Sequence, residues 1–289
     1  MRQPSKLPEV TRVARGWRRT LFRRMFRIAL FSLALTAGSI LLLMVLLRWV
    51  NPPYSMYMFS EAAGPMAPSL RRHWQPLATL PGHVPLAVIA AEDQRFPLHR
   101  GFDWQSIRRA IGGYWQGQRL RGASTISQQT AKNLFLWHGR SLTRKLLEAG
   151  FTVAIETLWP KARILEVYLN LAEWGPGVFG IESAARYHYG IPASQLSREQ
   201  AAMLAAVLPN PKAYSPTRPS ESVRNRAVWI ERQMLQLGPG WLDPVISSSV
   251  DGSIGAGNDP TPRSGDKPPH ATGTPAPSML GWHAGSPSP

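Results

Sequence analysis

Two adjacent carboxylates, Glu92 and Asp93, follow an apolar run at residues 86–91. Pro97 and Gly101 come soon after and break any helix, so the acidic pair stands where a buried element meets a loop. Apolar neighbours favour the protonated form of a carboxylate, whereas nearby arginines favour the ionised form. This balance suits a general base, and Glu92 is the candidate. A carboxylate that caps a turn beside an arginine has the same pattern and is the alternative.

A second group of polar residues follows Gly122. Ser124 can cap a helix, and Thr125, Gln129 and Lys132 then lie on one helix face at offsets of four and three. A hydroxyl, an amide and an ammonium therefore share one stripe, which could bind a polar or anionic ligand. A solvated helix face is the alternative interpretation.

A third group, Arg144, Lys145 and Glu148, lies in the first two turns of a helix that Ser141 can cap. Both cations can reach the carboxylate, and an ordinary intrahelical ion pair would stabilise the helix by only about 0.2 to 0.5 kcal/mol. Two cations beside one carboxylate leave surplus positive charge, which a bound pyrophosphate could use. Two apolar stripes on this helix predict that it is largely buried and ends near residue 159.

Helical periodicity continues through most of the remaining chain. Further helices are predicted at 103–116, 161–173, 181–189 and 221–237, and another after the capping box that begins at Ser197. Gly175 opens a G-x-G-x-x-G pattern, but the pattern follows a helix rather than a strand. A dinucleotide-binding fold is therefore excluded, and these glycines are interpreted as a turn. The elements together predict an all-α fold.

The N-terminal part of the chain has the pattern of a membrane anchor. Residues 28–47 carry no charge and are long enough to cross a hydrocarbon core of about 30 Å. Nine Arg or Lys and one Glu precede them, so the positive-inside rule places the N-terminus in the cytoplasm and exports the body. Pro52 and Pro53 are expected to end the helix. A cleavable signal peptide is the alternative.

Composition narrows the possible functions. The formal net charge is +16, but no RNP box, zinc-finger spacing or basic zipper is present, so no nucleic-acid partner is predicted. The chain contains no cysteine, which excludes disulfides and thiolate catalysis. The seven histidines are scattered, so no protein-borne metal site is predicted.

The acidic pair, the polar stripe and the cationic group resemble, in order and spacing, the motifs of the glycosyltransferase family 51 domain of peptidoglycan synthesis. The three motifs are E-D-x-x-F-x-x-H-x-G from residue 92, G-x-S-T-I-x-Q-Q from residue 122 and R-K-x-x-E from residue 144. Residues 161–190 are similar to the later motifs, and the likeness spans about residues 84–237. A short anchor without a second catalytic domain points to the monofunctional branch of the family, because bifunctional penicillin-binding proteins need several hundred further residues.

The resemblance implies a lysozyme-like fold and inverting polymerisation of lipid II into β-1,4-linked glycan, with release of undecaprenyl diphosphate. Glu92 is then the general base, and Glu148 is a catalytic group that orients cations or sugars. The departing pyrophosphate leaves without protonation if cations neutralise its charge. Lys132, Arg144 and Lys145 supply that charge.

The resemblance assigns roles to further residues. The expected substrate-binding residues include Asp93, Thr125, Gln129 and Asn133, and structural or orienting roles fall to Phe96, His99 and Ser124. No protein-bound cofactor is expected, although a divalent cation, Mg²⁺ or Mn²⁺, could accompany the pyrophosphate. Ser127 is a departure, since many relatives carry threonine there.

The predicted organisation has five parts. They are a basic cytoplasmic segment (1–27), a transmembrane anchor (28–50), a membrane-proximal segment (51–83), a glycosyltransferase domain (84–240) and a Pro/Gly/Ser-rich disordered tail (241–289). An S-x-x-K pattern from Ser264 is taken as coincidence, because no partner motif accompanies it.

The expected location is the inner membrane, as a single-pass protein with a periplasmic catalytic domain. The expected partners are lipid II, the growing glycan, the membrane and, in addition, other cell-wall synthases. One alternative is a lytic muramidase of the same fold, which would not need the cation cluster. Another is a non-catalytic, membrane-anchored basic protein, whose binding would depend on charge but not on Glu92 or Glu148.

Overall fold

A computed structural model describes residues 10–63, 70–115, 124–137, 139 and 141–247 of the chain, with side chains from residue 21 onward. The chain divides into two compact units, Met1–Pro53 and Tyr54–Pro289. Each unit is described by itself below.

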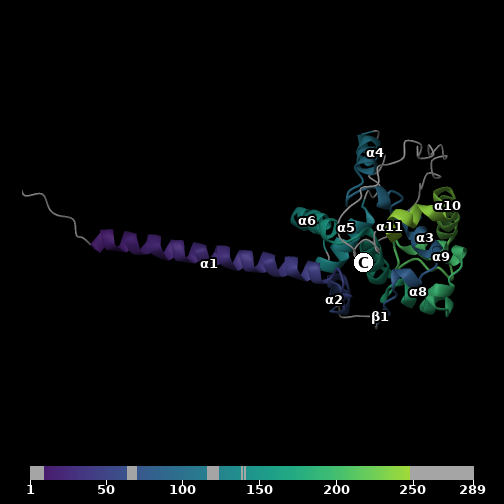
Figure 1. Ribbon diagram of the computed structural model, residues 1–289, viewed down its shortest axis with the longest axis horizontal. Coiled ribbons are helices and arrows are strands. Elements are labelled where there is room, and N and C mark those ends of the chain that lie inside the picture. The colour runs from purple at the N-terminus through teal and green to yellow at the C-terminus, as the bar shows by residue number, and fades with distance from the viewer. Residues whose placement is uncertain (1–9, 64–69, 116–123, 138, 140, 248–289) are drawn as a thin grey trace, which may run out of the picture. The chain divides into compact units, whose positions relative to one another are not determined.

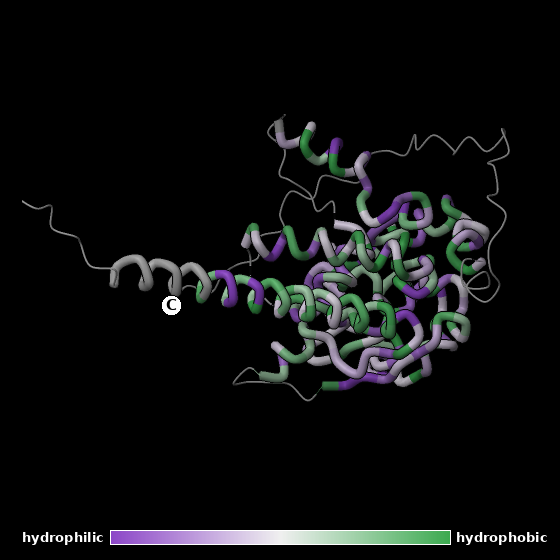
Figure 2. The backbone as a smooth tube through the Cα atoms, turned by 60° about the vertical axis from the view of Figure 1, so that its left-hand side comes forward, coloured by the Kyte–Doolittle hydropathy of each residue, from purple (hydrophilic) through white to green (hydrophobic). Residues whose placement is uncertain are grey.

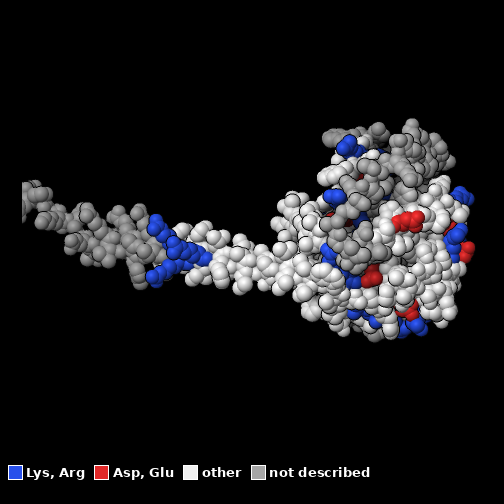
Figure 3. Space-filling view, in the orientation of Figure 1, with Lys and Arg blue, Asp and Glu red and all other residues white. Residues whose placement is uncertain are grey.

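The first unit contains helix α1 (Val10–Leu46). Its part from Leu21 to Leu46 is long and apolar enough to cross a bilayer. Arginine side chains gather on one part of this helix, and an uncharged, hydrophobic length follows (Figures 2 and 3). The helix ends before the predicted stop at Pro52, because the amides of Arg48 and Trp49 bond to the third carbonyl before them and tighten the last turn.

The second unit is built almost entirely of helices, as predicted (Figure 1). The α-helices are α2 (Met56–Ala62), α3 (His83–Glu92), α4 (Trp104–Trp115), α5 (Ile126–Phe135), α6 (Leu142–Leu158), α7 (Lys161–Leu171), α8 (Ile181–Tyr189), α9 (Arg198–Val207), α10 (Glu221–Leu237) and α11 (Asp243–Ser247). Short 3-10 turns are η1 (Leu77–Thr79), η2 (Phe96–Leu98), η3 (Ala193–Gln195) and η4 (Pro239–Leu242).

A small sheet has the strand order β1-β3-β2, which the sequence did not predict. Strand β1 (Arg71–Arg72) runs parallel to β3 (Val178–Phe179), and β2 (Glu173–Gly175) runs antiparallel to β3. The predicted glycine turn connects β2 and β3. Gly180 has a φ of +86°, and a Cβ at this position would approach the carbonyl oxygen of Asn170 to 3.1 Å, so a larger residue would be strained.

The core forms around two buried helices. In α3, every residue from Val84 to Ala90 is buried, and this helix packs against α9 and α10. In α7, nine of the eleven residues are buried, and α5 packs against both α6 and α7. Alanines on the buried side of α9 allow the close approach of its neighbours. The ends of α3 and α5 are therefore held by a rigid scaffold.

The prediction that α6 is largely buried is wrong. Only Glu148, Thr152 and Ile155 of this helix are fully buried, whereas Leu142 and Leu146 are 85% and 74% exposed. The helix packs against α5 and α7 on one side. Its two apolar stripes are wider than that contact, so the outer stripe remains uncovered within the described unit.

Contacts of the folded unit continue beyond both predicted boundaries of the catalytic domain, 84 and 240. On the N-terminal side, Met58 is buried and the Tyr57 hydroxyl donates to Glu173 Oε2 at 2.9 Å, so α2 belongs to the folded domain. On the C-terminal side, Trp241 Nε1 donates to the Gln94 carbonyl oxygen at 2.9 Å, and α11 packs against α7. The domain therefore extends to residue 247, while the rest of the predicted tail lies outside the described residues.

Candidate active site

Glu92 is the last residue of α3, and its side chain is only 15% exposed. Gln129 Nε2 donates to Glu92 Oε2 at 2.9 Å. Arg226 of α10 lies on the other side of the carboxylate, with one guanidinium nitrogen 3.5 Å from Glu92 Oε1 and 3.3 Å from the Ala91 carbonyl oxygen. Three helices therefore fix the position of this carboxylate.

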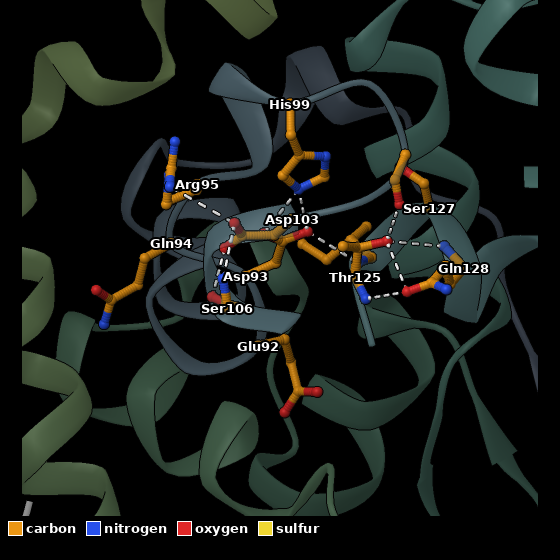
Figure 4. Close-up of polar contacts among 12 residues, drawn as sticks. Glu92, Asp93, Gln94, Arg95, His99, Asp103, Ser106, Thr125, Ser127 and Gln128 are labelled. Atoms are coloured by element: carbon orange, nitrogen blue, oxygen red, sulfur yellow. Dashed lines mark hydrogen bonds and ion pairs between the residues drawn. The ribbon is translucent and has the colours of Figure 1, made fainter. Parts of the chain in front are cut away.

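Asp93 points away from Glu92, as Figure 4 shows. Its carboxylate oxygens lie 2.9 and 3.0 Å from His99 Nε2, and one of them accepts the Ile126 backbone N–H at 3.0 Å. A carboxylate at a helix N-terminus satisfies an otherwise unpaired N–H and interacts favourably with the helix dipole. Asp93 thus fastens the start of α5 to the end of α3, which is an orienting geometry.

The cap of α5 is Thr125, and the prediction of Ser124 is wrong. The Thr125 hydroxyl accepts the Gln128 N–H at 3.2 Å and donates to the Gly101 carbonyl oxygen at 2.6 Å. The Gln128 side chain completes a capping box. Ser124 is exposed and precedes the cap. The buried Thr125 hydroxyl thus already donates one hydrogen bond and accepts another, so its role in this geometry is structural. Its predicted contact with substrate stays a prediction.

One face of α5 then presents Gln129, Lys132 and Asn133. Burial lowers the pKa of Lys132. Glu148 and Glu92 both oppose this effect, whereas Arg144 and Lys145 add to it. Lys132 therefore lies within electrostatic reach of both predicted catalytic carboxylates. Asn133 is half-buried on the same helix.

The cationic group on α6 has the predicted arrangement. Lys145 Nζ bonds to Glu148 Oε1, and an Arg144 guanidinium nitrogen lies 3.7 Å from Glu148 Oε2. The Glu148 side chain is only 4% exposed, while that of Lys145 is 52% exposed. A single buried carboxylate thus holds two cations beside Lys132, and the group retains net positive charge.

The loop after Glu92 is supported by a largely buried polar cluster. Phe96 is fully buried, and Lys161 Nζ lies 4.4 Å from the centre of its ring. Lys161 also bonds to Glu156 Oε1 at 2.8 Å, and the Ser127 hydroxyl donates to the same oxygen. The small hydroxyl side chain at position 127, where the resemblance expects threonine, is therefore part of this support.

The residues around the site do not fit a protein-held metal ion. Across the described ranges, no group of three His, Asp or Glu side chains is arranged to hold one. The carboxylate nearest the cations, Glu148, is occupied by Lys145 and Arg144. A divalent cation that accompanies the substrate stays a prediction.

Comparisons with known proteins identify the family of this chain. The profile of the family described as Transglycosylase matches residues 61–235. The chain belongs to the transglycosylase family. Proteins named biosynthetic peptidoglycan transglycosylase are similar to it over most of their length. The Pseudomonas aeruginosa protein is 54% identical over 224 residues, which cover 76% of this chain and 95% of the relative. The Pseudomonas putida KT2440 protein is 52% identical over 234 residues, which cover 79% and 98%.

Two residues near Glu92 of this transglycosylase were missed by sequence reasoning. Arg226 contacts Glu92 from α10, 134 positions along the chain, and Tyr168 contacts Gln129 from α7. Both belong to helices that the sequence predicted, and both helices were interpreted only as amphipathic packing elements. The one available signal was polarity inside such a helix, since Tyr168 is a phenol among apolar core residues.

Proposed function

We propose that this transglycosylase polymerises lipid II into β-1,4-linked glycan, with inversion at the sugar and release of undecaprenyl diphosphate. Membership of the family and the similarity to biosynthetic peptidoglycan transglycosylases support peptidoglycan as the product. The observation that carries the proposal is geometric: Gln129, which donates to Glu92 at 2.9 Å, lies one turn before Lys132 in α5, and α5 packs against α6, the helix of Arg144, Lys145 and Glu148. A base and a cationic site for a diphosphate are therefore adjacent.

Glu92 is proposed as the general base. A sugar hydroxyl is a poor nucleophile until its proton is removed, and a positioned base typically accelerates such a step by about 10²- to 10⁴-fold. Two donors hold the carboxylate, Gln129 at 2.9 Å and Arg226 at 3.5 Å. They leave lone pairs of the carboxylate free to accept the proton of the acceptor hydroxyl.

Lys132, Arg144 and Lys145 are proposed to bind the pyrophosphate of the donor. Burial lowers the pKa of Lys132, and an anionic pyrophosphate beside it would favour the protonated ammonium again. A diphosphate leaves without protonation when its developing charge is neutralised in this way. The chemistry therefore needs fixed cations rather than a second acid.

Glu148 is proposed to orient these cations. Its buried carboxylate already forms ion pairs with Lys145 and Arg144, so we assign it to holding these cations rather than to donating a proton. Removing it would release both cations from their positions. This assignment differs from that of a lytic muramidase, in which a glutamate acid protonates the leaving sugar oxygen.

We further propose an inner-membrane location with the N-terminus in the cytoplasm and the catalytic domain in the periplasm. The support is the apolar stretch of α1 with Arg23, Arg24 and Arg27 near its start. A polyprenyl-linked substrate stays in the bilayer, and tethering the enzyme there raises the effective concentration of both. Association with other cell-wall synthases stays a prediction, because no described contact bears on it.

The experiment is a turnover assay with labelled lipid II and the purified full-length protein. We expect long glycan from the wild type and none from Glu92→Gln, and we expect Arg144→Gln combined with Lys145→Gln to reduce turnover far more than membrane attachment. Degradation of existing murein without synthesis would favour the muramidase. Equal losses of turnover and membrane attachment in the cation variant would favour a non-catalytic binder.

A further inference from the structure

Tyr168 of α7 is a phenol inside the core, only 2% exposed. Its hydroxyl donates to Gln129 Oε1 at 3.3 Å. The opposite end of the same amide, Gln129 Nε2, donates to Glu92 Oε2 at 2.9 Å. A short chain of hydrogen bonds thus runs from the core of the domain, through one glutamine, to the proposed base.

The direction of this chain follows from the chemistry of its ends. A carboxylate accepts hydrogen bonds, so the amide must present its nitrogen to Glu92 and its oxygen to Tyr168. Tyr168 must then be the donor. Burial raises the pKa of Tyr168 far above the ordinary value, Glu92 and Asp93 raise it further, and only Arg226 lowers it. The phenol therefore stays protonated and can always donate.

The opposite amide orientation would place Gln129 Oε1 against the Glu92 carboxylate. Two acceptors would then face each other in a half-buried site, which is unfavourable. The hydroxyl of Tyr168 stabilises the orientation in which Gln129 Oε1 faces Tyr168 and Gln129 Nε2 faces Glu92. Ile164 and Leu165, one turn earlier in α7, are also fully buried, and a phenylalanine ring would fill the same space as the ring of Tyr168.

We propose that Tyr168 is a positioning residue for catalysis, which holds the Gln129 amide so that its N–H₂ group donates to Glu92. The inference rests on the proposed role of Glu92 as the base. Without the hydroxyl, Gln129 Oε1 loses its partner and the amide is free to rotate. Glu92 then keeps only the longer contact to Arg226, at 3.5 Å, and its carboxylate is less well oriented toward the acceptor hydroxyl.

The test is Tyr168→Phe in the full-length enzyme, measured as the pH dependence of lipid II turnover. We expect kcat to fall about two- to tenfold with KM for lipid II unchanged, the effect of one neutral hydrogen bond. The acidic limb of the rate profile should move to higher pH, because a carboxylate that loses a hydrogen-bond donor is less stabilised in its ionised form. Tyr189→Phe, which removes a half-buried phenol of α8, is the matched control and should leave both quantities unchanged.

A double-mutant cycle separates positioning from packing. If Tyr168 acts through Gln129, then Gln129→Ala combined with Tyr168→Phe should be no slower than Gln129→Ala alone. Additive losses would overturn the inference, as would a Tyr168→Phe enzyme with a lower Tm but a wild-type kcat and pH profile. Failure of the proposed function has a different signature, because Glu92→Gln would then retain turnover.

Discussion

Replacing Thr125 with valine removes one hydroxyl from the start of α5 and keeps the volume of the side chain. That hydroxyl has two partners, the Gln128 N–H at 3.2 Å and the Gly101 carbonyl oxygen at 2.6 Å. Thr125 is 2% exposed, so water cannot replace either bond without rearrangement of the loop. The substitution therefore tests whether this cap holds α5, and with it Gln129 and Lys132, in place.

The magnitude follows from the two lost interactions. Loss of an N-cap costs about 0.5 to 2 kcal/mol. The Gly101 carbonyl becomes a buried acceptor without its donor, which costs about 1 to 3 kcal/mol more. The free energy of unfolding should therefore fall by about 1.5 to 5 kcal/mol. For a domain of this size the expected fall in Tm is about 3 to 20 °C.

The assay is thermal unfolding of the purified full-length protein in detergent, followed by circular dichroism, with lipid II turnover measured below the transition. Thr125→Ser keeps the hydroxyl and should lose little stability. Ser124→Ala alters the neighbouring exposed residue and should have no measurable effect. If Ser124→Ala destabilised the protein as much as Thr125→Val, the assignment of the cap would be refuted.

Three further outcomes are expected. Lys161→Met should lower the free energy of unfolding by about 3 to 5 kcal/mol, because it leaves Glu156 buried without its cation, and adding Glu156→Gln should restore part of that loss in denaturant titrations. Burial raises the pKa of Glu173, so the folded state binds the proton of this carboxyl more tightly than the unfolded state does. Stability should therefore rise as the pH falls through the folded-state pKa. Glu173→Gln should flatten this part of the Tm–pH curve, and an unchanged curve would contradict the assignment. A chain that ends at residue 247 should keep the wild-type Tm and turnover, whereas one that ends at 238 should lose both.

The helices were predictable because their signals are local. Capping residues and apolar periodicity located α5 to α10 to within a few residues, and the glycine turn before α8 followed from Gly180 and its neighbours. The local sequence could not decide whether Ser124 or Thr125 caps α5. Either residue can cap a helix, and the hydrogen bond to Gly101, 24 positions away, accompanies the cap at Thr125.

Burial and pairing of the site residues also depend on tertiary contacts. Periodicity showed that α6 is apolar but not which neighbours cover it, so the exposure of Leu146 was not predicted. Spacing placed Gln129 and Lys132 on one face of α5, yet the partners of Glu92 come from two separate helices, α5 and α10. Arg226 and Tyr168 could not be assigned, because no sequence pattern connects them with residue 92.

The bond from Trp241 to the carbonyl of Gln94 makes the acidic loop depend on a residue near the C-terminal end of the described domain. The residues on either side of Glu92 are held by α10 and η4, which are among the last parts of the described domain to be synthesised. A chain elongated only as far as residue 240 would lack the bond from Trp241. The contacts that hold the acidic loop are therefore complete only once residues up to 241 have been synthesised.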